Sequence, residues 1–476
     1  MAGPTPQRTT LAPEPGSFRD WDGRVFAADG RVVRALTETG LADWTALSTS
    51  DLYERFTGEG TLVRTERADE QLLEELQRLD PEGNWVAALS HERLPFVSYP
   101  YEWTFSMLRD AALAQLRLTT AALGEELMLK DATPYNIQWR GAQPVFIDIG
   151  SFERAREGEP WAGYRQFCTL YLFPLMLEAY RGIPFQPWLR GSLDGISPVE
   201  FRALFGARDA LRRGMLRHVF LHANLERRYA DRGGKVREEL DAAGFDKRLV
   251  EASVSQMTRL VEGLRSPVSD SAWRDYRDTC TYSDAEALAK DEFVRRVVGA
   301  RERSLVWDLG CNDGHYSRIA SETASFTVAV DSDPTVVDML YRSLEEEGSR
   351  SILPLVVDLS NPSPALGWRN RERRTLVERG RPDLVLCLAL VHHLSISGNV
   401  PLREIVDWLE SLRAEVVFEF VDRDDPMVQR LLAAKRSDAH PDYTRTELDE
   451  ILRARLDVVE RLEASPTRVL YHARPR

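Results

Sequence analysis

The chain has 476 residues, of which 43% are hydrophobic and 29% charged, and its formal net charge at pH 7 is −13. This length predicts two or three domains, and the hydrophobic fraction excludes a wholly disordered chain. The acidic net charge argues against nucleic acid as the main partner, because binding to phosphates requires a basic surface.

Targeting and redox signals favour a cytoplasmic location. Residues 1–17 are rich in Pro, Thr and Gly and carry no signal segment, so we expect a disordered tail there. The longest apolar run, residues 167–180, is too short to span a bilayer and predicts a buried helix. The cysteines lack the paired spacing of a metal site, which fits a reduced compartment; they are Cys168, Cys280, Cys311 and Cys387.

The first 265 residues contain a helix followed by a hairpin. Leucines at positions 113, 116, 123 and 127 share one helical face. After the helix, residues 136–139 and 144–148 read as two strands joined by a turn at Gly141. We expect Tyr135 and Trp139 to be packing residues.

This segment resembles the protein-kinase and aminoglycoside-phosphotransferase superfamily. Asp131 is followed five residues later by Asn136, and Asp148-Ile-Gly150 comes about a dozen residues beyond, where that family has its Asp-Phe-Gly element. The resemblance implies an α+β kinase-like domain over residues 18–265. In an active member Asp131 would accept a hydroxyl proton, while Asn136 and Asp148 would hold Mg²⁺ on ATP.

The kinase-like pattern is incomplete upstream of the hairpin. The first lysine of the chain is Lys130, so no upstream lysine can contact nucleotide phosphates. Arg34 and Arg64 are the available substitutes, but neither lies in a convincing predicted strand followed by a helical glutamate. We therefore expect a degenerate domain. The alternative role of Asp131, Asn136 and Asp148 is to cap and brace loops.

The second half predicts a parallel α/β sheet. Residues 283–298 start with capping-box spacing and form an amphipathic helix. Four apolar strands follow at spacings of 20 to 30 residues, with helical segments between them. They end at Asp308, Asp331, Asp358 and Leu390. A fifth strand is expected at residues 414–421, a capped helix at 444–455, and closing strands at 456–461 and 468–473.

A tight turn follows the first of these strands. The run VWDLGCNDG at residues 306–314 places Gly310 and Gly314 where the backbone must turn closely around a ligand. A dinucleotide dehydrogenase would require G-x-G-x-x-G at this point, which the run does not supply.

This half resembles the class I S-adenosylmethionine-dependent methyltransferases, a Rossmann-like α/β fold, over residues 270–476. Their first motif is acid-x-Gly-x-Gly-x-Gly, and this chain departs from it with Asn312 at the middle glycine. The resemblance implies that the turn borders the methionine portion, that Asp331 holds the ribose and that Asp358 and Leu359 flank adenine. The implied cofactor-binding residues are Asp308, Gly310, Asn312, Gly314, Asp331, Asp358 and Leu359.

Candidate catalytic residues follow the fourth and fifth strands. His392 and His393 lie just past the fourth strand, where the methyl group would project, so one imidazole is a candidate general base. A structural role in packing the next turn is the alternative. Glu419 and then Asp422 are further candidates, although Asp422 fits a solvated loop better.

Both halves together resemble bacterial nodulation-associated methyltransferases. That resemblance implies methyl transfer to the oxygen or nitrogen of a small molecule, glycan or specialised metabolite. The kinase-like half would then be a binding module, which would hold Mg²⁺ and ATP only if Asn136 and Asp148 formed an active site. The alternative is a bifunctional kinase and methyltransferase that modifies one acceptor in succession. The acceptor and the oligomeric state are not determined by the sequence.

Overall fold

The C-terminal half forms a seven-stranded sheet with the order β12-β11-β10-β13-β14-β16-β15. The first five strands are parallel, and β16 pairs antiparallel with both β14 and β15. Their apolar sequences are continuous because helices cover both faces. The predicted parallel α/β sheet is confirmed. The strands are β10 (Val306–Leu309), β11 (Thr327–Asp331), β12 (Ile352–Val356), β13 (Leu384–Cys387), β14 (Glu415–Val421), β15 (Leu456–Ser465) and β16 (Arg468–Pro475).

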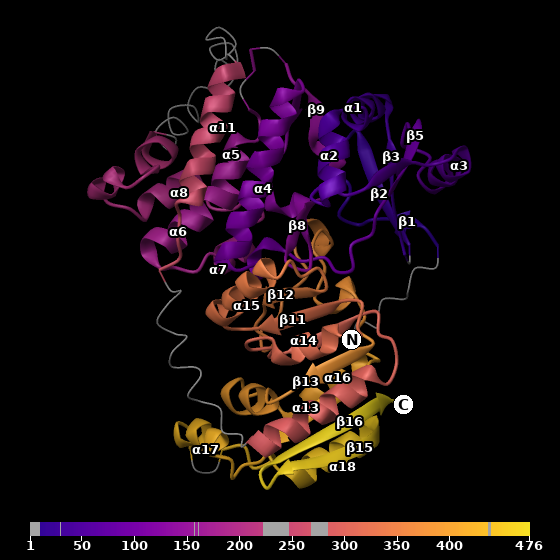
Figure 1. Cartoon of the computed structure of the whole chain (residues 1–476), viewed down its shortest axis with the longest axis vertical. Coiled ribbons are helices and arrows are strands. Elements are labelled where there is room, and N and C mark those ends of the chain that lie inside the picture. The colour runs from indigo at the N-terminus through magenta and orange to yellow at the C-terminus, as the bar shows by residue number, and fades with distance from the viewer. Residues whose placement is uncertain are drawn as a thin grey trace.

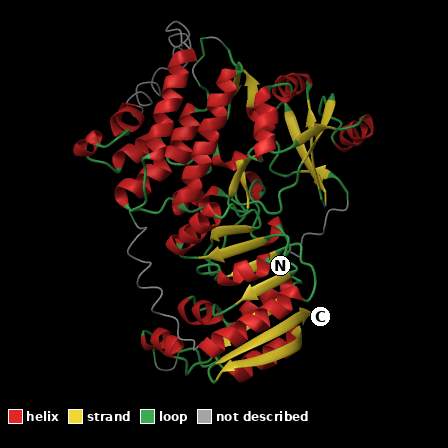
Figure 2. Cartoon of the chain, viewed as in Figure 1, coloured by secondary structure: helices red, strands yellow, loops and turns green. Residues whose placement is uncertain are grey.

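The computed structural model describes residues 10–28, 30–156, 158–159, 161–221, 247–267, 284–436 and 439–476. The predicted tail up to residue 9, Cys280, and Ser283 of the predicted capping box lie outside these ranges. Figure 1 shows the two halves stacked along the long axis, and Figure 2 shows strands and helices together in the C-terminal half, whereas helices make up much of the other half.

Helices cover the two faces of the C-terminal sheet, and their apolar side chains and capping residues account for their positions. Helices α13 and α14 pack apolar side chains such as Phe293 and Ile319 against β10, β13 and β14. Thr444 caps α18 by accepting a hydrogen bond from the Glu447 amide, as its spacing predicted. The helices are α13 (Asp284–Gly299), α14 (His315–Ser321), α15 (Pro334–Glu346), α16 (Leu402–Ser411), α17 (Pro426–Ala433) and α18 (Arg445–Arg455).

The N-terminal half begins with an antiparallel sheet of order β1-β2-β3-β5-β4. Its strands are β1 (Ala12–Pro13), β2 (Gly23–Ala28), β3 (Arg31–Leu36), β4 (Thr65–Arg67) and β5 (Ala87–His91), with helices α1 (Glu38–Ser48), α2 (Asp51–Glu59) and α3 (Glu70–Leu79) beside them. The expectation of disorder over residues 1–17 needs correction for β1. Its backbone pairs with β2, and composition alone did not reveal that pairing.

A mainly helical region follows. The hairpin of β7 (Ile137–Arg140) and β8 (Gln143–Phe146) turns at Gly141, as predicted. Residues 167–177 are buried, which confirms a buried helical segment there. None of the helices in the described ranges is long and apolar enough to cross a membrane. The other elements are α4 (Phe105–Gly124), β6 (Leu127–Leu129), β9 (Phe152–Arg154), α5 (Tyr164–Phe167), α6 (Phe173–Arg181), α7 (Gln186–Gly191), α8 (Pro198–Ala203) and α11 (Lys247–Glu262).

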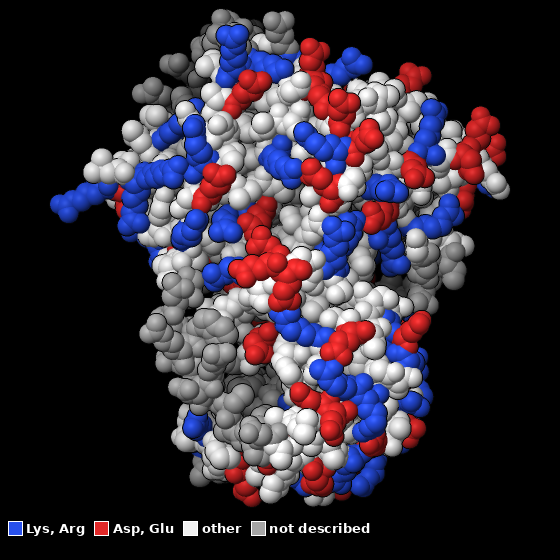
Figure 3. All heavy atoms as spheres, viewed as in Figure 1, with Lys and Arg blue, Asp and Glu red and all other residues white. Residues whose placement is uncertain are grey.

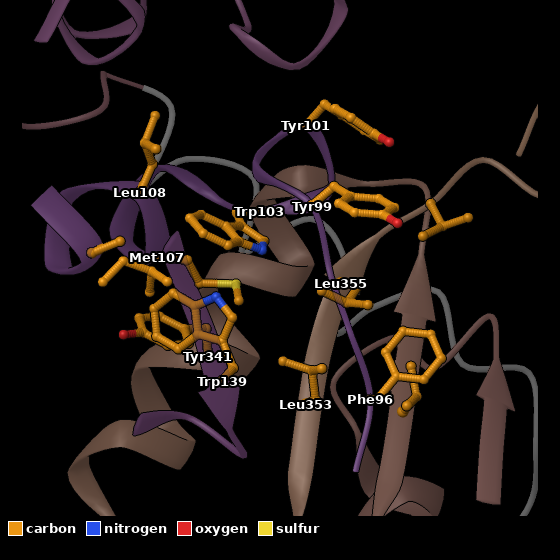
Figure 4. Packing of buried hydrophobic residues seen from close by; sticks show 14 of the residues in the cluster. Phe96, Tyr99, Tyr101, Trp103, Met107, Leu108, Trp139, Tyr341, Leu353 and Leu355 are labelled. Atoms are coloured by element: carbon orange, nitrogen blue, oxygen red, sulfur yellow. The ribbon is translucent and has the colours of Figure 1, made fainter. Parts of the chain in front are cut away.

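The N-terminal half packs against the β12 edge of the C-terminal sheet. The Trp139 ring makes edge-to-face contacts with both Trp103 and Tyr341, and the ring centroids are 5.5 Å apart in each pair. Figure 4 shows these rings beside Leu353 and Leu355 of β12. Trp139 is fully buried, which confirms its expected packing role. An exposed strand edge is a site for unwanted pairing, so this contact also protects β12.

Candidate functional site

The turn after β10 has a tight, left-handed backbone that a ligand could approach closely. Gly310, Asn312 and Gly314 have φ angles of 74°, 51° and 80°. A Cβ at Gly314 would lie 2.5 Å from the Leu340 side chain, so a glycine is required there. Asparagine tolerates the left-handed region better than most residues. The departure from the glycine motif at Asn312 therefore preserves the turn.

Asp331 joins this turn to the end of β11. Its Oδ2 accepts a hydrogen bond from the Asn312 amide at 3.1 Å, and its Oδ1 accepts one from the Asp333 amide at 3.0 Å. Each carboxylate oxygen retains capacity for a further donor. Asp331 is thus fixed in position and can still accept hydroxyl hydrogens of a ligand.

Asp358 and Leu359 follow β12 at the same edge of the sheet. Asp358 Oδ1 accepts hydrogen bonds from the amide and hydroxyl of Ser360, at 2.9 and 2.6 Å. Leu359 is half-buried and packs against the main core. Because the strands are parallel, these residues and Asp331 share the carboxyl edge at which open α/β sheets bind ligands.

Asp308 has a different environment from the other predicted cofactor residues. It is buried, and its Oδ2 accepts a hydrogen bond from Ser317 of α14 at 2.6 Å. Burial raises the pKa of Asp308 to about 6, against the opposing effects of Ser317 and Lys290. Asp308 braces the helix behind the turn.

The turn also contains a buried polar atom without a partner. Asn312 Oδ1 is buried and accepts no hydrogen bond from any described residue. Such atoms are rare in native proteins, and a bound molecule can supply the missing donor. This acceptor and the left-handed turn fit a ligand that carries hydrogen-bond donors and lies against the backbone.

The two adjacent histidines occupy different environments. His392 is 2% exposed, and its Nδ1 has no hydrogen-bond partner among the described residues. Burial lowers the pKa of His392 to about 3. His393 reaches the surface, and the partial withdrawal of its ring from solvent lowers its pKa, although Asp331 acts in the opposite direction. Of the pair, only His393 reaches the surface.

The local backbone accounts for the different environments of His392 and His393. Ala389 has a φ of 49°, which is strained for a residue with a side chain, and His393–Ser397 form one π-helical turn. Both features occur often at functional sites.

Glu419 is held in a buried cluster of charges. It is fully buried, with Oε2 2.6 Å from Lys290 Nζ and Oε1 3.5 Å from Arg468 Nη1. Arg468 also pairs with Asp425 at 2.9 Å. Both oxygens of Glu419 therefore face cations in the interior, a setting that favours a part in holding Lys290 over the predicted direct catalytic contact.

Lys290 is a functional candidate that the sequence interpretation missed. It comes from α13, is 4% exposed, and its ammonium lies 4.7 Å from the centre of the Tyr316 ring. Its spacing from Phe293, Val294 and Val297 puts a lysine on the apolar face of the helix, a signal present in the sequence. Asp422, in contrast, pairs with Arg445 at 3.3 Å, in keeping with a loop role.

In the N-terminal half, Asp131, Asn136 and Asp148 converge. Asn136 Nδ2 donates to Ser151 Oγ at 2.9 Å, and Ser151 Oγ donates to Asp148 Oδ2 at 2.7 Å. Burial and then the charge of Asp148 raise the pKa of Asp131.

Arg34 closes this cluster. It lies in β3, and its Nη2 is 2.6 Å from Asp148 Oδ1. Burial opposes ionisation of Asp148, but Arg34 and Ser151 hold its pKa below the usual value. The expectation that Arg34 lies outside a convincing strand was wrong. Arg34 lies in β3, which is short but pairs with a strand on each side. Among the residues described, no group of three His, Cys, Asp or Glu side chains is arranged to hold a metal ion.

Comparison with curated proteins identifies the family. The chain is 33% identical over 477 residues to the nodulation protein NoeA of Rhizobium meliloti (strain 1021), covering 99% of this chain and 96% of the relative. The chain belongs to the NoeA family. No protein-family model matches it.

Solved structures similar to this NoeA-family chain match about two fifths of it. The N-methyltransferase NodS from Bradyrhizobium japonicum WM9, in complex with S-adenosyl-L-homocysteine, is 14% identical, covers 40% of this chain and 87% of its own, and has a TM-score of 0.30. Magnesium protoporphyrin IX methyltransferase from Synechocystis PCC 6803, with the same ligand, is 16% identical over 43% of this chain and 92% of its own, with a TM-score of 0.30.

The strand order of the NoeA-family chain differs from that of a dinucleotide-binding sheet. A dinucleotide-binding sheet has the order 3-2-1-4-5-6 with strands in one direction. Here the antiparallel β16 lies between β14 and β15, which gives the order 3-2-1-4-5-7-6. The C-terminal half therefore has a Rossmann-like α/β fold whose strand order differs from that of a dinucleotide-binding sheet.

Proposed function

We propose that this chain is an S-adenosylmethionine-dependent methyltransferase that acts on an oxygen or nitrogen atom of a small molecule or glycan. The observation that carries the proposal is the hydrogen bond between the left-handed turn and Asp331, next to the exposed His393. A binding turn, a ribose acceptor and a candidate base therefore share one edge of the sheet.

The residues of this edge fit S-adenosylmethionine. When bound, this cofactor supplies a methyl group on a sulfonium. Gly310 and Gly314 would let the backbone approach its methionine portion, and the free lone pairs of Asp331 would accept the ribose hydroxyls. Asp358 and Leu359 would flank adenine. The unpartnered Asn312 Oδ1 would accept a donor from the methionine portion.

Acceptor activation is assigned to His393. His393 reaches the surface, and the partial withdrawal of its imidazole from solvent favours the neutral form that can take a proton from an acceptor hydroxyl or amine. Asp331 would stabilise the imidazolium that forms. Lys290 and Glu419 are assigned a positioning role, because a buried ion pair with a second cation beside it fixes the end of β14 behind the acceptor space.

The N-terminal half is assigned the role of a binding module with a degenerate kinase-like site. Arg34 occupies one oxygen of Asp148 and Ser151 the other, so the carboxylate that would hold Mg²⁺ faces a guanidinium instead. The convergence of Asp131, Asn136 and Asp148 is the observation that favours the alternative, a bifunctional kinase and methyltransferase.

Titration calorimetry with S-adenosylmethionine tests the main proposal. Asp331→Ala should weaken binding by on the order of 1 to 3 kcal/mol, as for the loss of buried hydrogen bonds to a charged group. Glu404→Ala, an exposed carboxylate on α16, is the matched control and should bind as the parent does. Unchanged affinity in Asp331→Ala, or no binding by the parent, would refute the assignment.

A further inference from the structure

A cavity of about 380 Å³ lies between the two halves of the chain, away from the sheet edge described above. Its volume is in the range of small-ligand sites. The N-terminal half contributes Gly60, Arg64, Glu92 and Arg140, and the C-terminal half contributes Arg350.

The charge of this cavity is opposite to that of the chain. Three guanidinium groups face one carboxylate, whereas the chain as a whole carries −13. On the face in Figure 3, acidic and basic side chains are interspersed. Arg64 and Arg350 make no ion pair with any residue in the described ranges. The cavity therefore holds positive charge that a ligand can neutralise.

Arg140 is held in place by its neighbours. Its Nη2 donates to Glu92 Oε1 at 2.6 Å, and its Nη1 donates to the Gly60 carbonyl at 3.2 Å. Gly60 ends α2 in the left-handed conformation, and a Cβ there would lie 2.8 Å from Arg140 Nη1. The glycine thus leaves room for the guanidinium.

Arg350 is positioned by a close contact between the two halves. The Ala142 amide donates to the Ser349 carbonyl at 3.0 Å, one residue before Arg350. A Cβ at Gly141 would lie 2.5 Å from the Arg350 backbone, so only glycine permits this approach. These backbone contacts hold Arg350 beside Gly141, so that Arg350 joins Arg64 and Arg140 in the lining of the cavity.

We propose that this cavity binds a tetrahedral oxyanion, presented as a phosphate or sulfate ester of a small polar molecule. Guanidinium groups offer paired N–H donors that match such oxygens and form strong charge-assisted hydrogen bonds. Arg350 lies just before β12, and the cofactor edge lies at the other end of that strand, roughly 16 Å away along its five residues. The site is therefore distinct from the methyl-transfer site and does not depend on it.

Titration calorimetry of the full chain at constant ionic strength tests this proposal with three probes: glucose 6-phosphate, glucose 6-sulfate and glucuronate. We expect saturable binding of at least one ester and at least tenfold weaker binding in both Arg64→Gln and Arg350→Gln. Arg403→Gln, an exposed arginine on α16, is the matched control and should bind as the parent does. The two esters distinguish phosphate from sulfate as the bound group.

Three results would overturn the proposal: no saturable binding of either ester, equal binding of glucuronate, or equal weakening in the control. Chemical denaturation of each variant checks that the fold is retained. Arg64 and Arg350 are exposed and lack ion pairs within the described ranges. We therefore expect the free energy of unfolding of each variant to match that of the parent.

Discussion

Glu102 in the N-terminal half and Arg379 in the C-terminal half form a buried, two-pronged ion pair. Both N–O distances are 2.6 Å, and neither side chain is more than 2% exposed. Ser363 donates a further hydrogen bond to Glu102 at 2.6 Å. Ser363 and Arg379 belong to the segment that follows Asp358, so this pair ties the N-terminal half to the predicted adenine side of the cofactor site.

Loss of this pair should destabilise the protein strongly. Glu102→Gln leaves Arg379 buried without a counter-ion, and we expect the free energy of unfolding to fall by about 3 to 5 kcal/mol. Glu322→Gln removes an exposed partner of Arg295 and should cost less than about 1 kcal/mol. Urea denaturation measures both, and equal costs for the two variants would show that burial of the pair contributes nothing.

Substitution of His393 and of His392 should affect the rate of methyl transfer differently. His393→Ala should slow single-turnover methyl transfer by about 10² to 10⁴, as for removal of a general base, with little change in cofactor affinity. His392→Gln should retain most of the rate, because His392 is buried. If both variants keep the full rate, the pair is structural. If both variants lose cofactor binding, the loop that carries the two histidines lies on the cofactor side of the site and not on the acceptor side.

The buried His392 should make stability depend on pH. Its pKa is lowered to about 3 in the folded chain, so below the ordinary value of 6.5 the unfolded chain binds a proton that the folded chain does not. Its contribution is constant above pH 6.5 and falls by on the order of 1.4 kcal/mol per pH unit as the pH drops toward 3.

Comparison with His392→Gln isolates this contribution, because other titrating groups are common to both proteins. Denaturation curves at pH 7, 6 and 5 should show the parent losing stability relative to the variant. A pH-independent difference would mean that His392 is protonated or solvated in the folded state.

The cluster around Arg34 should be structural. We expect no Mg²⁺-dependent ATP turnover above background, and Arg34→Ala should lower the free energy of unfolding by on the order of 1 to 3 kcal/mol, because Asp148 loses its partner. Arg31→Ala, an exposed arginine on the same strand, is the control. Robust phosphoryl transfer that is abolished by Asp148→Asn would instead establish the bifunctional alternative.

The sequence by itself determined the features that depend on neighbouring residues. The apolar runs ending at Asp308, Asp331 and Asp358 were readable as parallel strands because a strand covered on both faces is apolar throughout. The cap at Thr444 and the turn at Gly141 follow from local backbone chemistry. These elements and their order determined the C-terminal fold.

Only the tertiary structure decided which distant side chains meet. Arg34 and Asp148 are 114 positions apart, and Glu102 and Arg379 are 277 apart. No local pattern encodes such a pairing, because it depends on how whole elements pack. The burial of His392 beside the exposed His393, and the ion pair that removes Glu419 from the acceptor side, were decided in the same way. Packing decides which of these side chains are buried and which reach the surface.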